Sequence, residues 1–293
     1  MNADESQLEW TCRLNGIACV QLFSDFLDLR LSAFIGGFKK LAPQHPQFAV
    51  NKTVPRSIVK PAPRTIAIGD VHGCHTALAT LVDGLQLTPH DTLVMLGDVI
   101  DRGPDSRDCI NQLLALRERC HLYCIQGNHE QMMLDAIDGL MSIQEWLVHG
   151  GAETLDSYGK GFGIGEIDPE HVGFIRTWGD VCERPTHFFA HGNYLASRPL
   201  NRQPWRDLRW QSLKWHTPEP HLSGRTAVLG HTANKQAEIL NLGHLVCIDT
   251  YCHGDGWLTA FDVTTGRVWQ AKQTGEFQTA ELPPIQTPAA VRF

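Results

Sequence analysis

Gly69-Asp70-Val71-His72-Gly73 is the first of three segments that decide the fold, and the other two are Gly97-Asp98-Val99-Ile100-Asp101-Arg102-Gly103 and Gly127-Asn128-His129-Glu130. The polar residue after the first glycine recurs 28 and then 30 residues further along, close to the length of one strand-helix-strand unit. Ligands of an open parallel sheet bind outside the carboxyl ends of its strands. We therefore expect the three segments to lie side by side at one edge of a sheet.

Short apolar or β-branched runs precede the three segments and are predicted to form strands, at 65–68, 92–96 and 122–126. Between and after these runs, apolar residues recur at steps of three and four, as on one face of a helix. The recurring residues are Ala77, Leu78, Leu81, Val82 and Leu85, then Ile110, Leu113, Leu114 and Arg117, and finally Met132, Met133, Ala136, Ile137 and Leu140. This alternation of strand and helix predicts an α/β protein with a parallel sheet covered by helices.

Two later histidines also follow runs that are typical of strands. His191 directly follows residues 186–190, and Gly230 separates His231 from the run 226–229. The chain then continues with three further strand-like runs separated by turns, at 245–249, 257–263 and 267–270. A second sheet accounts for these runs with the fewest assumptions. The sequence thus predicts a two-sheet β-sandwich flanked by helices, within one catalytic domain at residues 64–273.

The order of these segments resembles the metal-dependent phosphoprotein phosphatases, within the calcineurin-like metallophosphoesterase superfamily. The pattern is GDxHG, GDxxDRG, GNHE, HG and a late histidine, and it is complete between residues 69 and 271. The run from Gly127 to Met133 and the Gly-His-Thr at 230–232 are more similar to the bacterial and phage branch. Each motif lies at the end of a predicted strand, which is the structural context that gives such a motif meaning.

The resemblance implies a two-metal centre built from six residues. Asp70 and His72 would hold one metal, Asn128, His191 and His231 would hold the second, and Asp98 would bridge both. Carboxylate, carbonyl and imidazole ligands suit divalent cations of the first transition row. We expect Mn²⁺, with iron or zinc as the alternatives. Two such cations lower the pKa of a shared water, so the implied nucleophile is a metal-bridging hydroxide that attacks phosphorus directly.

Phosphate-ester hydrolysis also needs donors for the phosphoryl oxygens and a proton for the leaving oxygen. Arg102 offers a planar fork of donors that matches phosphate, and Asn128 is a second candidate for substrate binding. His129 is the expected proton donor, oriented by Asp101 as the family pattern implies. A further phosphate-binding arginine is usual in the family, and Arg209 is our choice over Arg206 and Arg225.

The expected substrate is a phosphorylated protein, at phosphoserine or phosphothreonine, or a small phosphoester. Diadenosine tetraphosphatases are the alternative, but they typically lack an aspartate at the position of Asp101 and have Asp in place of Glu130. A non-catalytic, metal-stabilised binding module is a third reading. It does not explain why Asp101, Arg102 and His129 occur together, since a scaffold needs neither an acid nor a phosphate clamp.

Composition limits the partners. The net charge of −7 argues against a surface that coats nucleic acid, and the chain has no apolar run long enough to span a bilayer. The nine cysteines form no CxxC pair, so we expect reduced thiols and a cytoplasmic protein. The sequence leaves the oligomeric state open.

Several segments stay outside the predicted catalytic machinery. Residues 1–63 are expected to be an N-terminal extension with a proline-rich linker, and residues 274–293 a C-terminal tail. Glu130 is expected to be a helix-start carboxylate. Three tryptophans recur every five residues, at Trp205, Trp210 and Trp215. Packing in a core or lid is favoured for them over an aromatic wall of a substrate groove, because large aromatic side chains are mostly buried.

Overall fold

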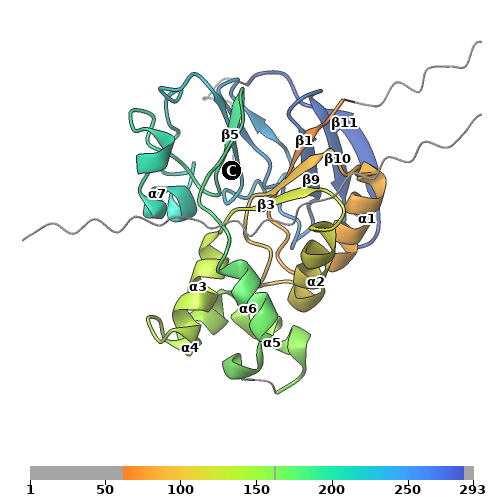
Figure 1. The fold of residues 1–293 in the computed structure, drawn as a ribbon, viewed down its shortest axis with the longest axis vertical. Coiled ribbons are helices and arrows are strands. Elements are labelled where there is room, and N and C mark those ends of the chain that lie inside the picture. Colours follow the sequence, from red (N-terminus) through yellow and green to blue (C-terminus); the bar gives the residue numbers. More distant parts are fainter. Residues whose placement is uncertain (1–61, 162, 287–293) are drawn as a thin grey trace, which may run out of the picture. The chain divides into compact units, whose positions relative to one another are not determined.

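The computed structural model describes residues 62–161 and 163–286. Most of the N-terminal extension expected at 1–63 therefore lies outside the described residues. The described part contains two β-sheets with helices around them (Figure 1), which confirms the predicted α/β sandwich.

The first sheet has six strands in the order β11-β10-β9-β1-β2-β3. Their bounds are β1 (Thr65–Ile68), β2 (Thr92–Met95), β3 (His121–Cys124), β9 (Leu258–Asp262), β10 (Arg267–Ala271) and β11 (Phe277–Glu281). β1 pairs in parallel with β2, and β2 pairs in parallel with β3, whereas β9 runs antiparallel to β1. The carboxyl ends of the three parallel strands therefore open at one edge, as the spacing of the three segments predicts.

The strand β11 lies in the stretch 274–293 that the sequence analysis sets apart as a tail. It pairs antiparallel with β10, from Arg267 opposite Glu281 to Ala271 opposite Phe277. Every residue of β11 is exposed, so the sequence shows no apolar alternation there. The sheet consequently extends beyond the boundary at residue 273.

The second sheet has five strands in the order β4-β5-β6-β8-β7. Their bounds are β4 (Cys182–Glu183), β5 (His187–Phe189), β6 (Thr226–Leu229), β7 (Leu240–Asn241) and β8 (Leu245–Cys247). β5, β6 and β8 are parallel, and the short strands β4 and β7 run antiparallel at the two edges. His191 and His231 thus follow neighbouring parallel strands.

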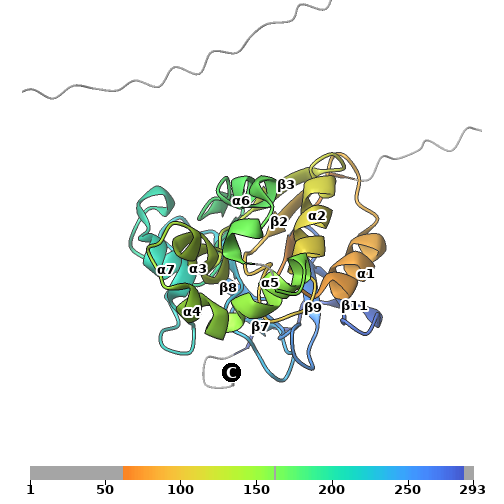
Figure 2. The same ribbon diagram turned by 90° about the horizontal axis from the view of Figure 1, so that it is seen from below.

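The three helices that the periodicity predicts are α1, α2 and α3, and further helices follow them in the chain. Their bounds are α1 (His75–Leu85), α2 (Ser106–Leu116), α3 (Asn128–Ile137), α4 (Ile143–Trp146), the π-helix η1 (Leu147–Gly151), α5 (Ala152–Tyr158), the 3-10 helix η2 (Ile164–Glu166), α6 (Pro169–Ile175), the 3-10 helix η3 (Leu200–Arg202) and α7 (Trp205–Trp210). In Figure 1, α3 to α6 gather below the sheets, and Figure 2 shows the same group from beneath. Within the described residues, no helix has both the length and the apolar character that a membrane span requires.

The core follows the two-residue period of the strands. In β1, Ile66 and Ile68 pack with the residues of α1 and α2, whereas Ala67 between them packs with residues of the second sheet. Phe189 and Val228 of the second sheet belong to this inter-sheet cluster. Successive side chains of a strand point to opposite faces, so each sheet contributes one face to the space between the sheets.

Candidate metal centre

The candidate ligands follow strands of both sheets. In chain order they are Asp70, His72, Asp98, Asn128, His191 and His231. The first three come from the loops after β1 and β2, and the fourth is the first residue of α3. The two histidines come from the loops after β5 and β6. The ends of five strands, three from the first sheet and two from the second, therefore meet at the candidate site.

The backbone of this region is strained at several residues other than glycine. Left-handed φ values of 48°, 50°, 71°, 69° and 62° occur at His72, Asp98, Asp101, Arg102 and His231. Such conformations cost on the order of 1–3 kcal/mol each and persist where their surroundings hold them. Two of these loops are tied together, because the N–H groups of Val71 and His72 both donate to the carbonyl of Asp98, at 3.0 and 2.9 Å.

The carboxylate of Asp98 lies between two histidines. Its Oδ2 is 3.6 Å from Nε2 of His72, and its Oδ1 is 3.3 Å from Nε2 of His191. Possible ligand atoms of Asp98, His191 and His231 all lie within 4.8 Å of one another, and the same holds for Asp98, His72 and His129. Two sets of donors that share one carboxylate fit a pair of cations.

Hydrogen bonds to backbone carbonyls orient the imidazoles. Nδ1 of His72 pairs with the carbonyl of Ile100 at 3.0 Å, and Nδ1 of His191 pairs with that of Leu96 at 2.8 Å. Histidines that bind metal commonly donate their second ring N–H in this way, which fixes the tautomer and the ring orientation. Each ring thereby keeps its Nε2 on the side of Asp98. Nε2 of His191 is also 3.1 Å from Oδ1 of Asn128.

Asp70 is buried and lies near Asp249, a residue that the sequence analysis does not single out. The N–H of His231 lies 3.0 and 3.1 Å from the two oxygens of Asp70. Burial, followed by the charge of Asp249, raises the pKa of Asp70 well above its usual value, and burial also raises the pKa of Asp249 to about 6. A cation would offset this crowding of buried carboxylates. The position of Asp249, as the last residue of the predicted strand 245–249, was the available sequence signal.

The same cluster shifts the pKa values of its other members. Burial by itself would raise the pKa of Asp98, but the neighbouring His191 and His129 outweigh it, so the pKa lies well below its usual value. Burial would lower the pKa of His191, but Asp98 outweighs it and raises that pKa to about 10. Burial and the nearby His191 lower the pKa of His231 to about 4. Asp98 and His191 thus act electrostatically as a pair.

The predicted acid, its orienting carboxylate and the predicted phosphate clamp lie beside this cluster. Nδ1 of His129 is 2.8 Å from Oδ2 of Asp101, and both residues are buried. Arg102 is exposed, and its Nη1 lies 2.8 Å from Nε2 of His72. A guanidinium can only donate, so the imidazole nitrogen accepts this bond. The structure therefore brings Asp101, Arg102 and His129 together beside His72 and Asp98.

Arg209 lies in a different setting. Its Nε donates to Oδ1 of Asp180 at 2.7 Å, and its guanidinium carbon is 5.9 Å from the centre of the Trp205 ring. The guanidinium of Arg209 is therefore engaged with Asp180 and Trp205. The structure therefore adds no contact that supports Arg209 as a phosphate ligand.

A comparison with protein families agrees with this geometry. The model described as calcineurin-like phosphoesterase matches residues 63–255. The chain belongs to the calcineurin-like phosphoesterase family. Members of this family depend on two metal ions, and this phosphoesterase carries the candidate ligands for them.

Relatives of this phosphoesterase carry two kinds of name. Serine/threonine-protein phosphatase 1 of Salmonella typhimurium is 34% identical over 142 residues, which cover 44% of this chain and 59% of that protein. The symmetrical bis(5'-nucleosyl)-tetraphosphatase of Janthinobacterium sp. is 24% identical over 275 residues, which cover 71% of this chain and 96% of that protein. The chain thus spans little more than half of the first relative and nearly all of the second.

Solved structures share the fold. A protein described as a candidate diadenosine tetraphosphatase has a TM-score of 0.56 at 19% identity, over 75% of this chain and 93% of that one. A cold-active protein-tyrosine phosphatase of a Shewanella species has a TM-score of 0.51 at 18% identity, over 74% of this chain and 80% of that one. At such low identity these likenesses speak for the fold alone.

Glu130 does more in this phosphoesterase than start a helix. Its carboxylate accepts the N–H of Gly127 at 2.9 Å, as a helix-capping group does. It also accepts the N–H groups of Asp98 at 2.9 Å, Val99 at 2.7 Å and Ile100 at 3.4 Å. Burial and the charge of Asp98 raise the pKa of Glu130 to about 7. This side chain therefore holds the loop that carries Asp98 against the start of α3.

The three tryptophans of the segment 205–215 are exposed, so the expectation that they pack in a core is wrong. Trp205 is 42% exposed, Trp210 is 39% exposed and Trp215 is 84% exposed. The carbonyl of Trp210 is 3.1 Å from Nε2 of His231, and its indole N–H donates to Gln131 at 2.9 Å. Trp205 and Trp210 are the first and last residues of α7, whose buried residue is Leu208. The end of this helix lies next to the candidate ligand His231.

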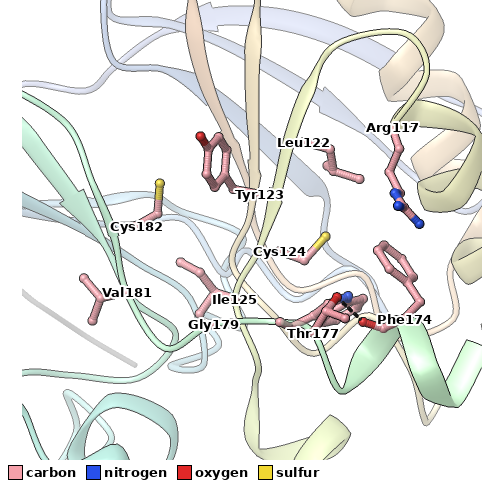
Figure 3. Close-up of a pocket in the computed structure, with 11 residues that line it drawn as sticks. Arg117, Leu122, Tyr123, Cys124, Ile125, Phe174, Thr177, Gly179, Val181 and Cys182 are labelled. Atoms are coloured by element: carbon pink, nitrogen blue, oxygen red, sulfur yellow. Dashed lines mark hydrogen bonds between the residues drawn. The ribbon is translucent and has the colours of Figure 1, made fainter. Parts of the chain in front are cut away.

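A separate cavity of about 360 Å³ lies at the edge of β3 (Figure 3). Its lining includes Arg117, Leu122, Cys124, Phe174 and Trp178. None of the candidate metal ligands lines it. The cavity is thus distinct from the metal centre.

Proposed function

We propose that this chain hydrolyses phosphomonoesters at a two-cation centre, and that its substrates are phosphoserine and phosphothreonine in proteins. The observation that carries the proposal is the position of Asp98, whose Oδ2 lies near His72 and whose Oδ1 lies near His191, with the His129–Asp101 pair and Arg102 beside it. Membership of the calcineurin-like phosphoesterase family supports the reaction class.

The residues at the centre fit two divalent cations. Asp70 and His72 would hold one, Asp98 would contact both, and Asn128, His191 and His231 would hold the other. We propose Mn²⁺, since mixed oxygen and imidazole ligands suit it, with iron or zinc as alternatives. When bound, two cations supply an activated water and neutralise the charge of a phosphoryl group.

The other residues of the site bind the ester and move one proton. Arg102 is exposed at the rim and offers its guanidinium to the phosphoryl oxygens. Asn128 has a side-chain amide that can donate to the same group. His129 gives its Nε2 proton to the leaving oxygen as the P–O bond breaks, and Asp101 stabilises the charged imidazole through Nδ1.

Two features support a phosphoprotein substrate. The relative from Salmonella typhimurium is named a serine/threonine-protein phosphatase. Asp101 and Glu130 occupy the two positions at which the sequence resembles phosphatases more closely than tetraphosphatases. Both side chains are buried and bonded here, Asp101 to His129 and Glu130 to the loop of Asp98. Their burial and their contacts beside the candidate ligands support the proposal.

A dinucleotide polyphosphate is the second candidate, because Trp205 and Trp210 are exposed on α7 and the backbone carbonyl of Trp210 lies 3.1 Å from Nε2 of His231. Stacking of a base on an aromatic side chain contributes about 1–3 kcal/mol. The relative from Janthinobacterium sp. that spans most of this chain is named a bis(5'-nucleosyl)-tetraphosphatase. If this candidate is correct, Trp205→Ala should raise KM for diadenosine tetraphosphate and leave KM for a phosphoserine peptide unchanged.

The deciding experiment strips the metal, restores Mn²⁺ and measures turnover of a phosphoserine peptide and of diadenosine tetraphosphate in parallel. The proposal expects metal-dependent turnover of the peptide that is lost in His129→Asn and Asp98→Asn. His121→Asn and Asp83→Asn are matched surface controls, because both residues are exposed. Preference for the dinucleotide would select the second candidate. Metal binding without turnover of either ester would contradict both.

We further propose that residues 64–273 form the catalytic domain, to whose sheet β11 adds a strand, and that the protein works in the cytoplasm. The seven cysteines within the described residues are all free thiols, as expected in a reducing compartment. Fractionation of cells that express the full chain tests the location.

A further inference from the structure

The residues Asp101 and Arg102 form a left-handed pair, with φ values of 71° and 69°. The helical segment 143–158 holds both of them. The N–H of Arg102 donates to the carbonyl of Gly150 at 3.1 Å, and the N–H of Asp101 lies 2.9 Å from Oγ1 of Thr154. A single segment that follows α3 in the chain therefore fixes both the acid's carboxylate and the phosphate clamp.

The carboxylate of Asp101 is completely buried and has a donor on each oxygen besides His129. Nε1 of Trp146 donates to Oδ2 at 3.0 Å, and Oγ1 of Thr154 donates to Oδ1 at 2.7 Å. Nδ1 of His129 shares Oδ2 with the indole, at 2.8 Å. Two donors on Oδ2 and one on Oδ1 leave the carboxylate little freedom to turn.

The hydroxyl directions in this network follow from counting protons. Thr154 has one hydroxyl proton, which goes to Asp101. The hydroxyl of Ser106, 2.9 Å from that of Thr154, must therefore donate to it. The N–H of Asp101 then donates to the two hydroxyl oxygens, at 3.1 and 2.9 Å. Every polar atom of the network thus has a partner.

The indole of Trp146 occupies a fitted slot. The side chain is fully buried at the end of α4. A Cβ atom added to Gly151 would lie 2.4 Å from the ring of Trp146, so only glycine leaves room for the indole in this position. The π-helix η1, which contains Gly151, brings the chain back over the ring. The position of the indole N–H is therefore set by packing.

We propose that Trp146 is a positioning residue for proton transfer to the leaving group. Its N–H fixes Oδ2 of Asp101, Asp101 fixes Nδ1 of His129, and Nε2 of His129 stays on the side of Asp98, 3.9 Å from Oδ2 of that residue. The proton then goes from Nε2 of His129 to the leaving oxygen as the P–O bond breaks, while Asp101 stays an unprotonated carboxylate and Trp146 keeps its indole N–H. This inference rests on the proposed function, because it assigns a task within that reaction.

The test compares an ester that needs a proton for its leaving group with one that does not. Trp146→Phe keeps most of the ring volume and removes the N–H. We expect kcat for phenyl phosphate to fall about tenfold, a part of the range typical of general acids. We expect kcat for p-nitrophenyl phosphate and both KM values to change little. Equal losses for the two esters, or no loss for either, would overturn the proposal.

Trp178→Phe is the matched control. Trp178 is also buried, but its Nε1 has no hydrogen-bond partner among the described residues. Removing that N–H should leave unchanged the ratio of kcat for phenyl phosphate to kcat for p-nitrophenyl phosphate.

A second pair of variants tests the other oxygen of Asp101. Thr154→Val should lower this ratio of kcat values, as Trp146→Phe does. Thr154→Ser keeps the hydroxyl and should keep the ratio at its wild-type value. This pair decides the question if Trp146→Phe does not fold.

A spectroscopic readout separates this inference from the proposed function. In the zinc-loaded full chain, the Nδ1 proton of His129 should give a downfield proton resonance in the wild type and in Trp178→Phe. The resonance should move or broaden in Trp146→Phe. If no ester is turned over but the resonance behaves in this way, the proposed function fails and the positioning role stands. An unchanged resonance in Trp146→Phe would overturn the positioning role.

Discussion

The backbone N–H of Asp98 donates to Oε2 of Glu130 at 2.9 Å, across 32 residues of sequence. Through this bond and those of the next two N–H groups, a side chain at the start of α3 sets the shape of the loop that carries the central carboxylate. Glu130 has no free lone pair to offer a metal when it serves four N–H groups. Its task is to hold the ligand loop in place.

The first prediction concerns this bond. Glu130→Ala leaves several buried N–H groups without a partner, so we expect the free energy of unfolding to fall by about 3–5 kcal/mol. The metal content after purification should fall as well, which elemental analysis measures. Glu166→Ala is the matched control, because Glu166 caps Gly163 in the same way but on the surface. Glu166→Ala should lower the free energy of unfolding by about 1 kcal/mol and leave the metal content unchanged. Full metal content in Glu130→Ala would refute the assigned task.

The second prediction concerns the phosphate clamp. Arg102→Ala should lower kcat/KM for a phosphoserine peptide about 100-fold, since donors to developing charge contribute on this scale. Arg102→Lys should recover little of the lost kcat/KM, because an ammonium group cannot make the two parallel hydrogen bonds of a guanidinium. Arg184→Ala is the control, at an arginine that stacks on Tyr123 away from the centre. Steady-state kinetics measure all three. A lysine variant with wild-type activity would argue against paired contacts from Arg102.

The third prediction concerns Asp249. Asp249→Asn removes one negative charge near Asp70, so the metal-free protein should melt at a higher temperature. The rise in Tm on adding Mn²⁺ should become smaller, because less charge is left for the cations to neutralise. Asp255→Asn, an exposed position in the same loop, should change neither quantity. Calorimetry with and without Mn²⁺ measures both. An unchanged Mn²⁺ effect in Asp249→Asn would contradict the electrostatic role.

The fourth prediction concerns pH and lies away from the metal centre. Asp91 accepts the N–H of Thr88 and two side-chain N–H groups of Arg64, at 2.8, 3.2 and 2.7 Å. Burial would raise its pKa, but these bonds outweigh burial and lower it to about 2. A carboxyl with a lowered folded-state pKa stabilises the fold above its unfolded value and loses this effect as the pH falls.

Asp91→Asn should therefore lower the free energy of unfolding by about 2 kcal/mol at pH 7, the contribution of bonds to a charged group. The difference from the wild type should shrink as the pH falls from about 4 to about 2. Urea titrations at several pH values measure it. A difference that stays constant down to pH 2 would mean that packing, not charge, accounts for the effect.

Much of the fold could be predicted from the sequence because its apolar residues recur with the periods of a strand, 2 residues, and of a helix, about 3.6 residues. The three glycine-containing segments also mark strand ends, and all six predicted ligands lie together in the structure. The exposed strand β11 has no apolar period and could not be found this way. The tryptophans of 205–215 were misplaced because a general rule about burial says nothing of a short surface helix.

Side-chain networks were beyond the reach of these patterns. The bonds from Trp146 and Thr154 to Asp101 join residues 45 and 53 positions apart. A helical period predicts that a tryptophan is buried, but it does not predict which polar atom meets its N–H. Asp249 entered the sequence analysis only as the last residue of the predicted strand 245–249, because it belongs to none of the recognised motifs. Partners of this kind become visible when the loops are placed in space.

The candidate metal centre lies where loops from the two sheets meet, so bound ions would connect the two sheets. Asp70 and His231 are 161 residues apart in the chain, yet they meet through a hydrogen bond between the two sheets. Ions held jointly by residues of both sheets would act as cross-links that close very long loops, and the entropy of closing such a loop grows with its length. Assembly of the sandwich and uptake of the ions would then be one cooperative event, so an ion-depleted cell would hold less of the folded protein as well as less of its activity.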